Sequence, residues 1–354
     1  MSADAVRAAL ARVVDPEIHR PITDLDMVRS VDVAGSTAIV DLALTIVGCP
    51  AADVIERDVR AAVLGVPGIE SLDLTVGVMS VPEREALVAR LRGSRGPQFG
   101  PGTLTKIFAI TSGKGGVGKS TLTANLAVAL AARGLKVGLV DADVFGFSIP
   151  GILGIPGAKP TKVGDLMLPP VAHGVSVISI GMFLDSPSTA VSWRGPLLHR
   201  TIQQFLSDVW WGDLDVLLLD LPPGTGDVAI SVGQLLPHAE VLVVTTPQPA
   251  AAEVAERSGL VARQTGQSVI GVVENMTGEL FGSGGGDAVA ERLGVPVLAR
   301  VPLSRALREG GDAGAPVVLA DPADPAAASL LTLAASLATR ARDLPGRKLP
   351  LSPR

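Results

Sequence analysis

The chain has 354 residues, 47% of them hydrophobic and 18% charged, so it is long enough for two domains and can bury a substantial core. Aromatic residues make up only 3% and the formal net charge is −5, which argues against a stacking surface or basic patch for nucleic acid. No apolar run approaches the length of a membrane span. We therefore expect a cytoplasmic protein with no membrane or nucleic-acid partner.

Residues 1–92 have the pattern of a small α+β domain. In chain order we expect a helix with Val6, Leu10 and Val13 on one face, strands at Met27–Val33 and Ala38–Ile46, a helix from about Ala51, a strand from Leu72 to Val78, and a helix carrying Leu87 and Leu91. Residues 93–103 are rich in glycine and proline and lack periodicity, so we predict a linker there.

Residues 104–343 repeat a strand-then-helix pattern. Apolar strands are predicted at Ile107–Ile110, Val137–Val140, Val175–Ile180, Val216–Leu219, Val241–Val244, Val269–Val273 and Val297–Val301. Strands buried on both faces and alternating with helices predict an α/β fold with a doubly wound parallel sheet, which binds ligands at the carboxyl ends of its strands. Residues 344–354 hold three prolines and scattered basic residues and are expected to be disordered.

A glycine-rich loop follows the first of these strands and precedes a helix pattern, which is the setting of a phosphate-binding loop. It satisfies the frame G-x-x-x-x-G-K-[ST]. Its backbone N–H groups can surround phosphate oxygens, Lys119 can reach the β- and γ-phosphates, and Ser120 can offer its hydroxyl to Mg²⁺. The predicted binding residues are Gly113, Lys114, Gly115, Gly116, Val117, Gly118, Lys119, Ser120 and Thr121.

Carboxylates follow two further predicted strands. Asp141 and Asp143 come after Val137–Val140, where a carboxylate can orient the attacking water or a Mg²⁺-bound water, or can simply cap a turn. Asp220 ends an apolar strand, which is the Walker-B pattern of an acid near Mg²⁺. The segment Leu221–Asp227 holds two prolines and two glycines and suits either sensing of the γ-phosphate or an ordinary rigid turn.

Asn275 and Cys49 each allow two interpretations. Asn275 follows a strand, and its amide can bond an adenine edge or form an Asx turn. Cys49 is the chain's one cysteine and lies before the helix expected from Ala51. A helix N-terminus lowers a thiol pKa and favours metal binding, whereas a lone cysteine is more often a small buried hydrophobic residue.

In combination, these motifs resemble the Mrp/ApbC-type iron–sulfur cluster carrier ATPases, a branch of the deviant Walker-A P-loop class. The strings that carry the resemblance are the loop at 111–121, Asp141-Ala-Asp143, Asp220–Asp227 and Glu274-Asn-Met276. Residues 1–92 resemble an iron–sulfur assembly-type domain through Asp15-Pro-Glu17 and Gly48-Cys-Pro50.

The resemblance implies roles for individual residues. Lys114, Lys119 and Asp143 would be catalytic, with Lys114 reaching the nucleotide of a partner subunit and Asp143 placing the water. Ser120 and Asp220 would support Mg²⁺, and Asn275 would touch adenine. The implied cofactors are ATP and Mg²⁺, and an iron–sulfur cluster is allowed as a third, with Cys49 as a candidate ligand.

The implied function is a slow, Mg²⁺-dependent ATPase that binds iron–sulfur clusters or transfers them to apoproteins. It would work as a nucleotide-sandwiched homodimer with iron–sulfur client or assembly proteins as partners. Most of the family has a C-x-x-C pair beyond the Glu-Asn-Met segment, whereas Thr277–Gly286 contains no cysteine, so four-thiolate ligation by two such pairs is impossible here. The alternative is a nucleotide-switched positioning or scaffold ATPase that carries no cluster.

Overall fold

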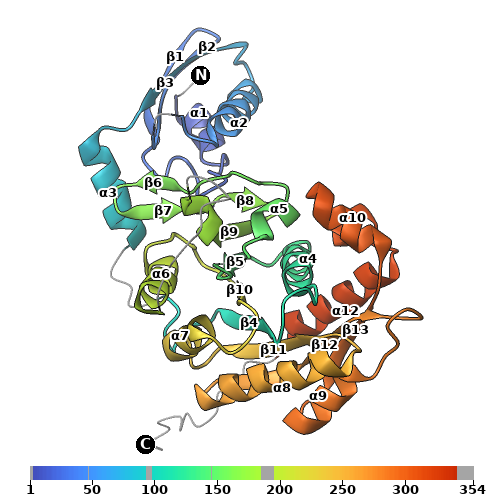
Figure 1. Ribbon diagram of the computed structural model, residues 1–354. Helices are drawn as coiled ribbons and strands as arrows, with labels where there is room; N and C mark the ends of the chain where they lie inside the picture. Colours follow the sequence, from blue (N-terminus) through green and yellow to red (C-terminus); the bar gives the residue numbers. More distant parts are fainter. Residues whose placement is uncertain (1–2, 47, 93–97, 145, 185–194, 341–354) are drawn as a thin grey trace, which may run out of the picture.

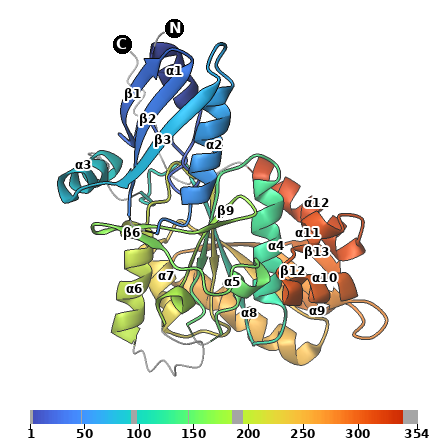
Figure 2. The same cartoon turned by 90° about the horizontal axis from the view of Figure 1, so that it is seen from above.

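The computed structural model describes residues 3–46, 48–92, 98–144, 146–184 and 195–340 (Figure 1). These residues form a three-stranded sheet, an eight-stranded sheet and a separate two-stranded hairpin. The small sheet with its helices lies at one end of the molecule, beside the hairpin and one edge of the large sheet (Figures 1 and 2).

The N-terminal part is α+β, as predicted. Its elements are α1 (Ala3–Leu10), β1 (Val28–Ala34), β2 (Thr37–Leu44), α2 (Ala52–Leu64), β3 (Ser71–Val78) and α3 (Val81–Arg92). The central strand β2 pairs antiparallel with β1 and parallel with β3. Its inward residues Ala38, Val40 and Leu42 are fully buried because the strand alternates between core and surface. The helix α1 ends before Val13, which reaches the core from the following turn instead.

The C-terminal part alternates strands and helices. Its strands are β4 (Lys106–Ser112), β5 (Val137–Asp141), β6 (Thr161–Val163), β7 (Leu166–Leu168), β8 (Val171–Ala172), β9 (Val175–Ser179), β10 (Val216–Asp220), β11 (Glu240–Thr245), β12 (Ser268–Thr277) and β13 (Val297–Pro302). Its helices are α4 (Lys119–Ala131), α5 (Ile149–Ile152), η1 (Ile180–Phe183), α6 (Gly195–Ser207), α7 (Asp227–Leu235), α8 (Pro249–Gln264), α9 (Gly285–Leu293), α10 (Arg305–Ala313), α11 (Val317–Ala320) and α12 (Pro325–Thr339).

All seven predicted strands lie in the large sheet, whose order is β13-β12-β11-β4-β10-β5-β9-β8. Every described pairing is parallel except that of β8 with β9. The predicted doubly wound parallel sheet is therefore confirmed. The antiparallel edge strand β8 was not predicted, because its two residues give no recognisable sequence pattern. Helices α4, α11 and α12 pack on one another and α6 to α9 form a second group, so the sheet lies between two layers (Figure 1).

The β6–β7 hairpin departs from the predicted division of the chain. It follows β5 in sequence, yet Val163, Leu166 and Leu168 are buried in the same hydrophobic cluster as the N-terminal part. Strands of three residues have no readable periodicity, and their partners lie more than a hundred residues away, as in the bond from Thr161 to Glu17. The sequence pattern therefore holds no sign of this packing.

Two sequence predictions fall on residues outside the described ranges. The predicted linker at 93–103 is described only from residue 98, and the predicted disordered tail at 344–354 is outside entirely. No helix in the described part of the chain is long and apolar enough to cross a membrane.

Candidate nucleotide-binding site

The glycine-rich loop connects the carboxyl end of β4 to the first residue of α4, as its motif predicts. Gly118 has φ +81° in the left-handed region, and a Cβ there would lie 2.4 Å from Nδ2 of Asn275. A Cβ on Gly113 would lie 2.2 Å from the backbone of Val254 and Ala255. Glycine is thus required at both positions, because a side chain at Gly118 would collide with Asn275 and one at Gly113 would collide with the backbone of α8.

A cavity of about 530 Å³ opens over this loop. It is lined by Ser112, Lys114, Gly115, Gly116, Val117, Gly118, Lys119, Ser120, Thr121, Asp143, Gly146, Ser148, Pro222 and Pro223. Eight of the nine predicted loop residues line it, all but Gly113. The two prolines come from the segment Leu221–Asp227, which suits either sensing of the γ-phosphate or an ordinary rigid turn. The N-terminus of α4 faces the cavity, which favours an anionic ligand there.

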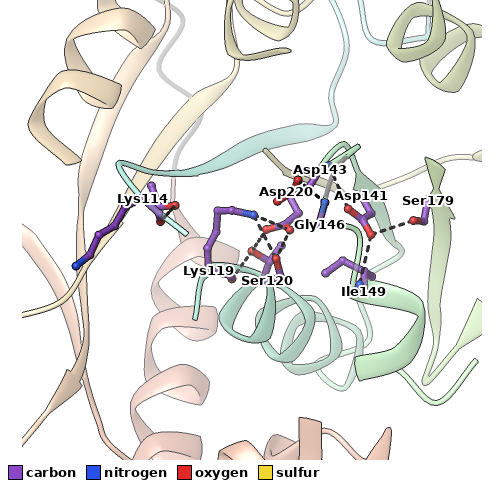
Figure 3. Close-up of polar contacts among 11 residues, drawn as sticks. Lys114, Lys119, Ser120, Asp141, Asp143, Gly146, Ile149, Ser179 and Asp220 are labelled. Carbon is purple, nitrogen blue, oxygen red and sulfur yellow. Dashed lines mark hydrogen bonds and ion pairs between the residues drawn. The ribbon is translucent and has the colours of Figure 1, made fainter. Parts of the chain in front are cut away.

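Lys119, Ser120 and Asp220 form one polar cluster beneath the cavity (Figure 3). Nζ of Lys119 lies 2.7 Å from Oδ2 of Asp220, and the hydroxyl of Ser120 donates to the same oxygen at 2.6 Å. Lys119 and Asp220 are both buried. An ammonium, a hydroxyl and a carboxylate grouped at a helix N-terminus match the donor set that holds a nucleotide phosphate and Mg²⁺.

Thr123 is a member of this cluster that the sequence analysis missed. Its Oγ1 lies 2.9 Å from Oδ1 of Asp220 and 2.9 Å from the carbonyl oxygen of Lys119. A hydroxyl has one proton, so it serves one of these acceptors at a time. The available signal was its spacing, because Thr123 is four residues after Lys119 and therefore on the same helix face.

The two aspartates after β5 have different environments. The Asp141 carboxylate is fully buried and accepts hydrogen bonds from the hydroxyl of Ser179 at 2.9 Å and from two backbone N–H groups. Burial, and then the negative charge of Asp220, raise its pKa to about 7. Asp143 instead lines the cavity, where its Oδ1 accepts from the N–H of Gly146 at 3.0 Å.

Lys114 lies on the same loop but apart from this cluster. Its side chain is exposed and points away from Lys119 and the two aspartates (Figure 3). Its ammonium is therefore available to a group outside the cluster of Lys119, Ser120 and Asp220.

Asn275 contacts the loop. The side chain is buried at the end of β12, and its Nδ2 donates to the carbonyl oxygen of Val117 at 2.8 Å. This bond explains the close approach to Gly118 and fixes the loop against β12. Contact with adenine stays a prediction.

Cys49 lies away from this site, in the N-terminal hydrophobic cluster, and is 6% exposed. Of its two interpretations, the small buried hydrophobic residue is confirmed and the lowered pKa is wrong: burial raises the thiol pKa, the nearby carboxylates of Glu17 and Asp15 raise it further, and the N–H of Ala51 offsets only part of this. The loss of solvent therefore affects the thiol pKa more than the position of Cys49 before α2 does. Across the described residues, no group of three or more histidine, cysteine, aspartate or glutamate side chains can hold a metal ion.

Comparison with known proteins agrees with this geometry. Residues 103–338 match a family described as NUBPL iron-transfer P-loop NTPase, and residues 3–75 match one described as iron–sulfur cluster assembly protein. A relative named iron–sulfur cluster carrier protein, from Mycobacterium tuberculosis, is 52% identical over 99% of this chain and 96% of its own.

Two solved structures share the fold of the C-terminal part. A nucleotide-binding protein from Archaeoglobus fulgidus in complex with ADP has a TM-score of 0.52 and 37% identity, over 59% of this chain and 86% of that one. The septum site-determining protein MinD from Pyrococcus horikoshii, complexed with Mg-ADP, has a TM-score of 0.51 and 27% identity, over 65% and 94%. The chain belongs to the iron-transfer P-loop NTPase family, with an iron–sulfur cluster assembly domain before the NTPase domain.

Proposed function

We propose that this protein is a slow, Mg²⁺-dependent ATPase that serves iron–sulfur cluster assembly or transfer and works as a homodimer. The observation that carries the ATPase part is the cluster of Lys119, Ser120 and Asp220 under a cavity at the N-terminus of α4. Its residues fit a nucleoside triphosphate and Mg²⁺ because they offer a cation, a hydroxyl and a carboxylate at a positive helix end.

Each residue of the cluster has a distinct task in this proposal. Lys119 turns from Asp220 to the β- and γ-phosphates, and Asp220 then supports the metal together with the Ser120 hydroxyl. Mg²⁺ supplies neutralisation of the charge that develops on the phosphate oxygens. Asp143 places the attacking water, because it lines the cavity while Asp141 is buried and held by Ser179.

Lys114 supports the dimer. Two bound triphosphates that face each other would repel, and the exposed ammonium of Lys114 can reach across to the partner's phosphates. Asn275 holds the loop through its bond to Val117, and in this proposal its amide also contacts adenine.

The cluster part of the proposal is supported by the family and by the names of the relatives. The chain's residues do not fit a cluster held by four of its own thiolates, because Cys49 is its one cysteine and is buried. Two copies would supply at most two thiolates. A cluster handled by this protein would therefore be completed by small thiols or by the cysteines of an iron–sulfur client protein.

The test of the ATPase proposal is phosphate release from ATP with and without Mg²⁺, in wild type and in Lys119→Ala. Removing the cation that faces the transferring phosphate should lower the rate by about 10²- to 10³-fold. Lys136→Ala, at an exposed position directly before β5, is the matched control and should hydrolyse ATP at the wild-type rate. Equal rates in Lys119→Ala and wild type would contradict the assignment.

A further inference from the structure

The chain between β5 and β9 leaves the large sheet and returns to it at a single carboxylate. The excursion comprises α5, β6 and β7, and the chain rejoins the large sheet at β8 and β9. Oδ2 of Asp141 accepts from the N–H of Ile149 at 3.3 Å, where the excursion begins, and from the hydroxyl of Ser179 at 2.9 Å, at the end of the returning strand β9. The start of the excursion and the strand that follows it are thus bonded to the same carboxylate, next to the cluster of Lys119, Ser120 and Asp220 (Figure 3).

The start of this excursion forms one wall of the nucleotide cavity. Asp143, Gly146 and Ser148 line the cavity, and Ser148 is followed directly by α5. The carbonyl oxygen of Ser148 accepts from the N–H of Ile152, so the wall continues into that helix. A phosphate bound on this side of the cavity would therefore contact the chain that leads to the hairpin.

The far end of the excursion is built into the N-terminal domain. Val163, Leu166 and Leu168 of the hairpin are almost completely buried in that domain's hydrophobic cluster. Thr161 donates from its hydroxyl to Oε1 of the buried Glu17 at 3.0 Å. Figures 1 and 2 both place the hairpin between the small sheet and the large one.

Trp210 extends this contact. Its ring N–H donates to the carbonyl oxygen of Ile18 at 3.2 Å, and the guanidinium of Arg20 lies 5.4 Å from the ring centroid. The N–H of Trp210 also donates to the carbonyl oxygen of Met167 in β7 at 2.8 Å. The segment Glu17–Arg20 is thus held by the hairpin and by a residue that is itself bonded to the hairpin.

We propose that Asp141 and the β6–β7 hairpin couple the nucleotide site to the N-terminal domain, so that bound ATP loosens the packing of the hairpin and opens access to Cys49. The proposal rests on ATP binding at the cavity described above. Cys49 lies in the same hydrophobic cluster as the hairpin, close to Glu17 and Asp15. Because Cys49 is 6% exposed, a looser packing of the hairpin would be read as a rise in the exposure of this residue.

The experiment measures the rate at which a thiol reagent labels the full-length protein. Cys49 is the chain's one cysteine, so every label reports this position, and Cys49→Ser provides the blank. Rates are compared without nucleotide, with Mg-ADP and with a Mg-bound nonhydrolysable ATP analogue. Binding of a fluorescent ATP analogue is measured in the same samples. We expect the ATP analogue to raise the labelling rate about tenfold and ADP to raise it less, since labelling follows the open population.

Two variants test the connection itself. Ser179→Ala removes a bond that ties β9, the strand by which the chain returns from the excursion, to Asp141, and it should keep nucleotide binding while losing most of the ATP-dependent rise. Thr161→Val removes the bond to Glu17 and should raise labelling already without nucleotide. Both are compared with wild type for secondary structure and melting temperature.

The outcomes are distinguishable. An analogue that binds but leaves the Cys49 labelling rate unchanged overturns the coupling and leaves the proposed ATPase standing. A full ATP-dependent rise in both Ser179→Ala and Thr161→Val overturns the route through Asp141 and the hairpin. Failure of wild type to bind any ATP analogue overturns the coupling and the proposed function together.

Discussion

Asp141 and Asp220 end neighbouring parallel strands and are paired in register, yet they carry different partners. Asp220 is ion-paired with Lys119 at 2.7 Å, whereas Asp141 accepts from Ser179 and from backbone N–H groups. Burial and the neighbouring charge of Asp220 raise the pKa of Asp141 to about 7. The two carboxylates thus have different surroundings: Asp220 belongs to the cluster that we propose binds phosphate and Mg²⁺, and Asp141 bonds to the neighbouring chain.

Thr123 should position Asp220 for the metal. Replacing it by valine removes a hydroxyl 2.9 Å from Oδ1 of Asp220 and leaves that buried oxygen without this donor. We expect the Mg²⁺ concentration needed for half-maximal ATPase activity to rise about 10- to 100-fold, as for other residues that orient a metal ligand.

Thr123→Ser is the matched control, because it keeps the hydroxyl and should stay near the wild-type Mg²⁺ requirement. A Thr123→Val variant with an unchanged Mg²⁺ requirement and a lower melting temperature would show that Thr123 serves packing alone.

Glu17 should make the stability of the protein depend on pH. Its pKa is raised from 4.5 to about 7, mainly by burial. An acid whose pKa is higher in the folded state contributes its stability below pH 4.5 and loses it as the pH rises through 7, because folding then buries a charged carboxylate. Glu17→Gln does not titrate and still offers an oxygen to Thr161.

The free energies of unfolding of wild type and Glu17→Gln should therefore diverge between pH 5 and pH 8, with the variant more stable at pH 8 by about 1–3 kcal/mol. Asp15, His19 and Cys49 are present in both proteins, so the difference isolates Glu17. A constant gap across this range would mean that Glu17 does not titrate there.

ATP should bring two copies together, since facing triphosphates need the two Lys114 ammonium groups between them. Light scattering on Asp143→Ala, which should bind ATP without consuming it, is expected to report a monomer without nucleotide and a dimer with Mg-ATP. A strict monomer at high concentration in ATP would count against the sandwiched arrangement, and a complete dimer without nucleotide would show that ATP is not its switch.

Cys49 decides whether this chain contacts a cluster directly. Anaerobic reconstitution should yield weak, oxygen-sensitive visible absorption, with iron and sulfide both present, and Cys49→Ser should lose it while keeping ATPase activity. A cluster completed by small thiols would be exposed and labile. Wild-type protein that holds no iron with or without ATP would favour an ATPase that acts as a scaffold on other carriers.

The parts of the site that a local sequence motif marks were predictable. The loop at 113–121 and Asp220 each stand at the end of an apolar strand, and the parallel sheet brings those ends together. The different environments of Asp141 and Asp143 were not predictable, because they depend on Ser179, which lies thirty-eight positions beyond Asp141. The burial of Cys49 agrees with the common fate of a lone cysteine, whereas the residues that cover it belong to distant parts of the chain and could not be named from the sequence.

We propose an ATPase whose Lys114 acts on the partner's nucleotide. Its most direct test is steady-state phosphate release by Lys114→Ala, measured together with the affinity for a fluorescent ATP analogue. Lys114 points away from Lys119 and Asp220 of its own subunit. We therefore predict wild-type affinity for the ATP analogue, with hydrolysis reduced by about 10²-fold or more. Hydrolysis by Lys114→Ala at the wild-type rate would contradict the account.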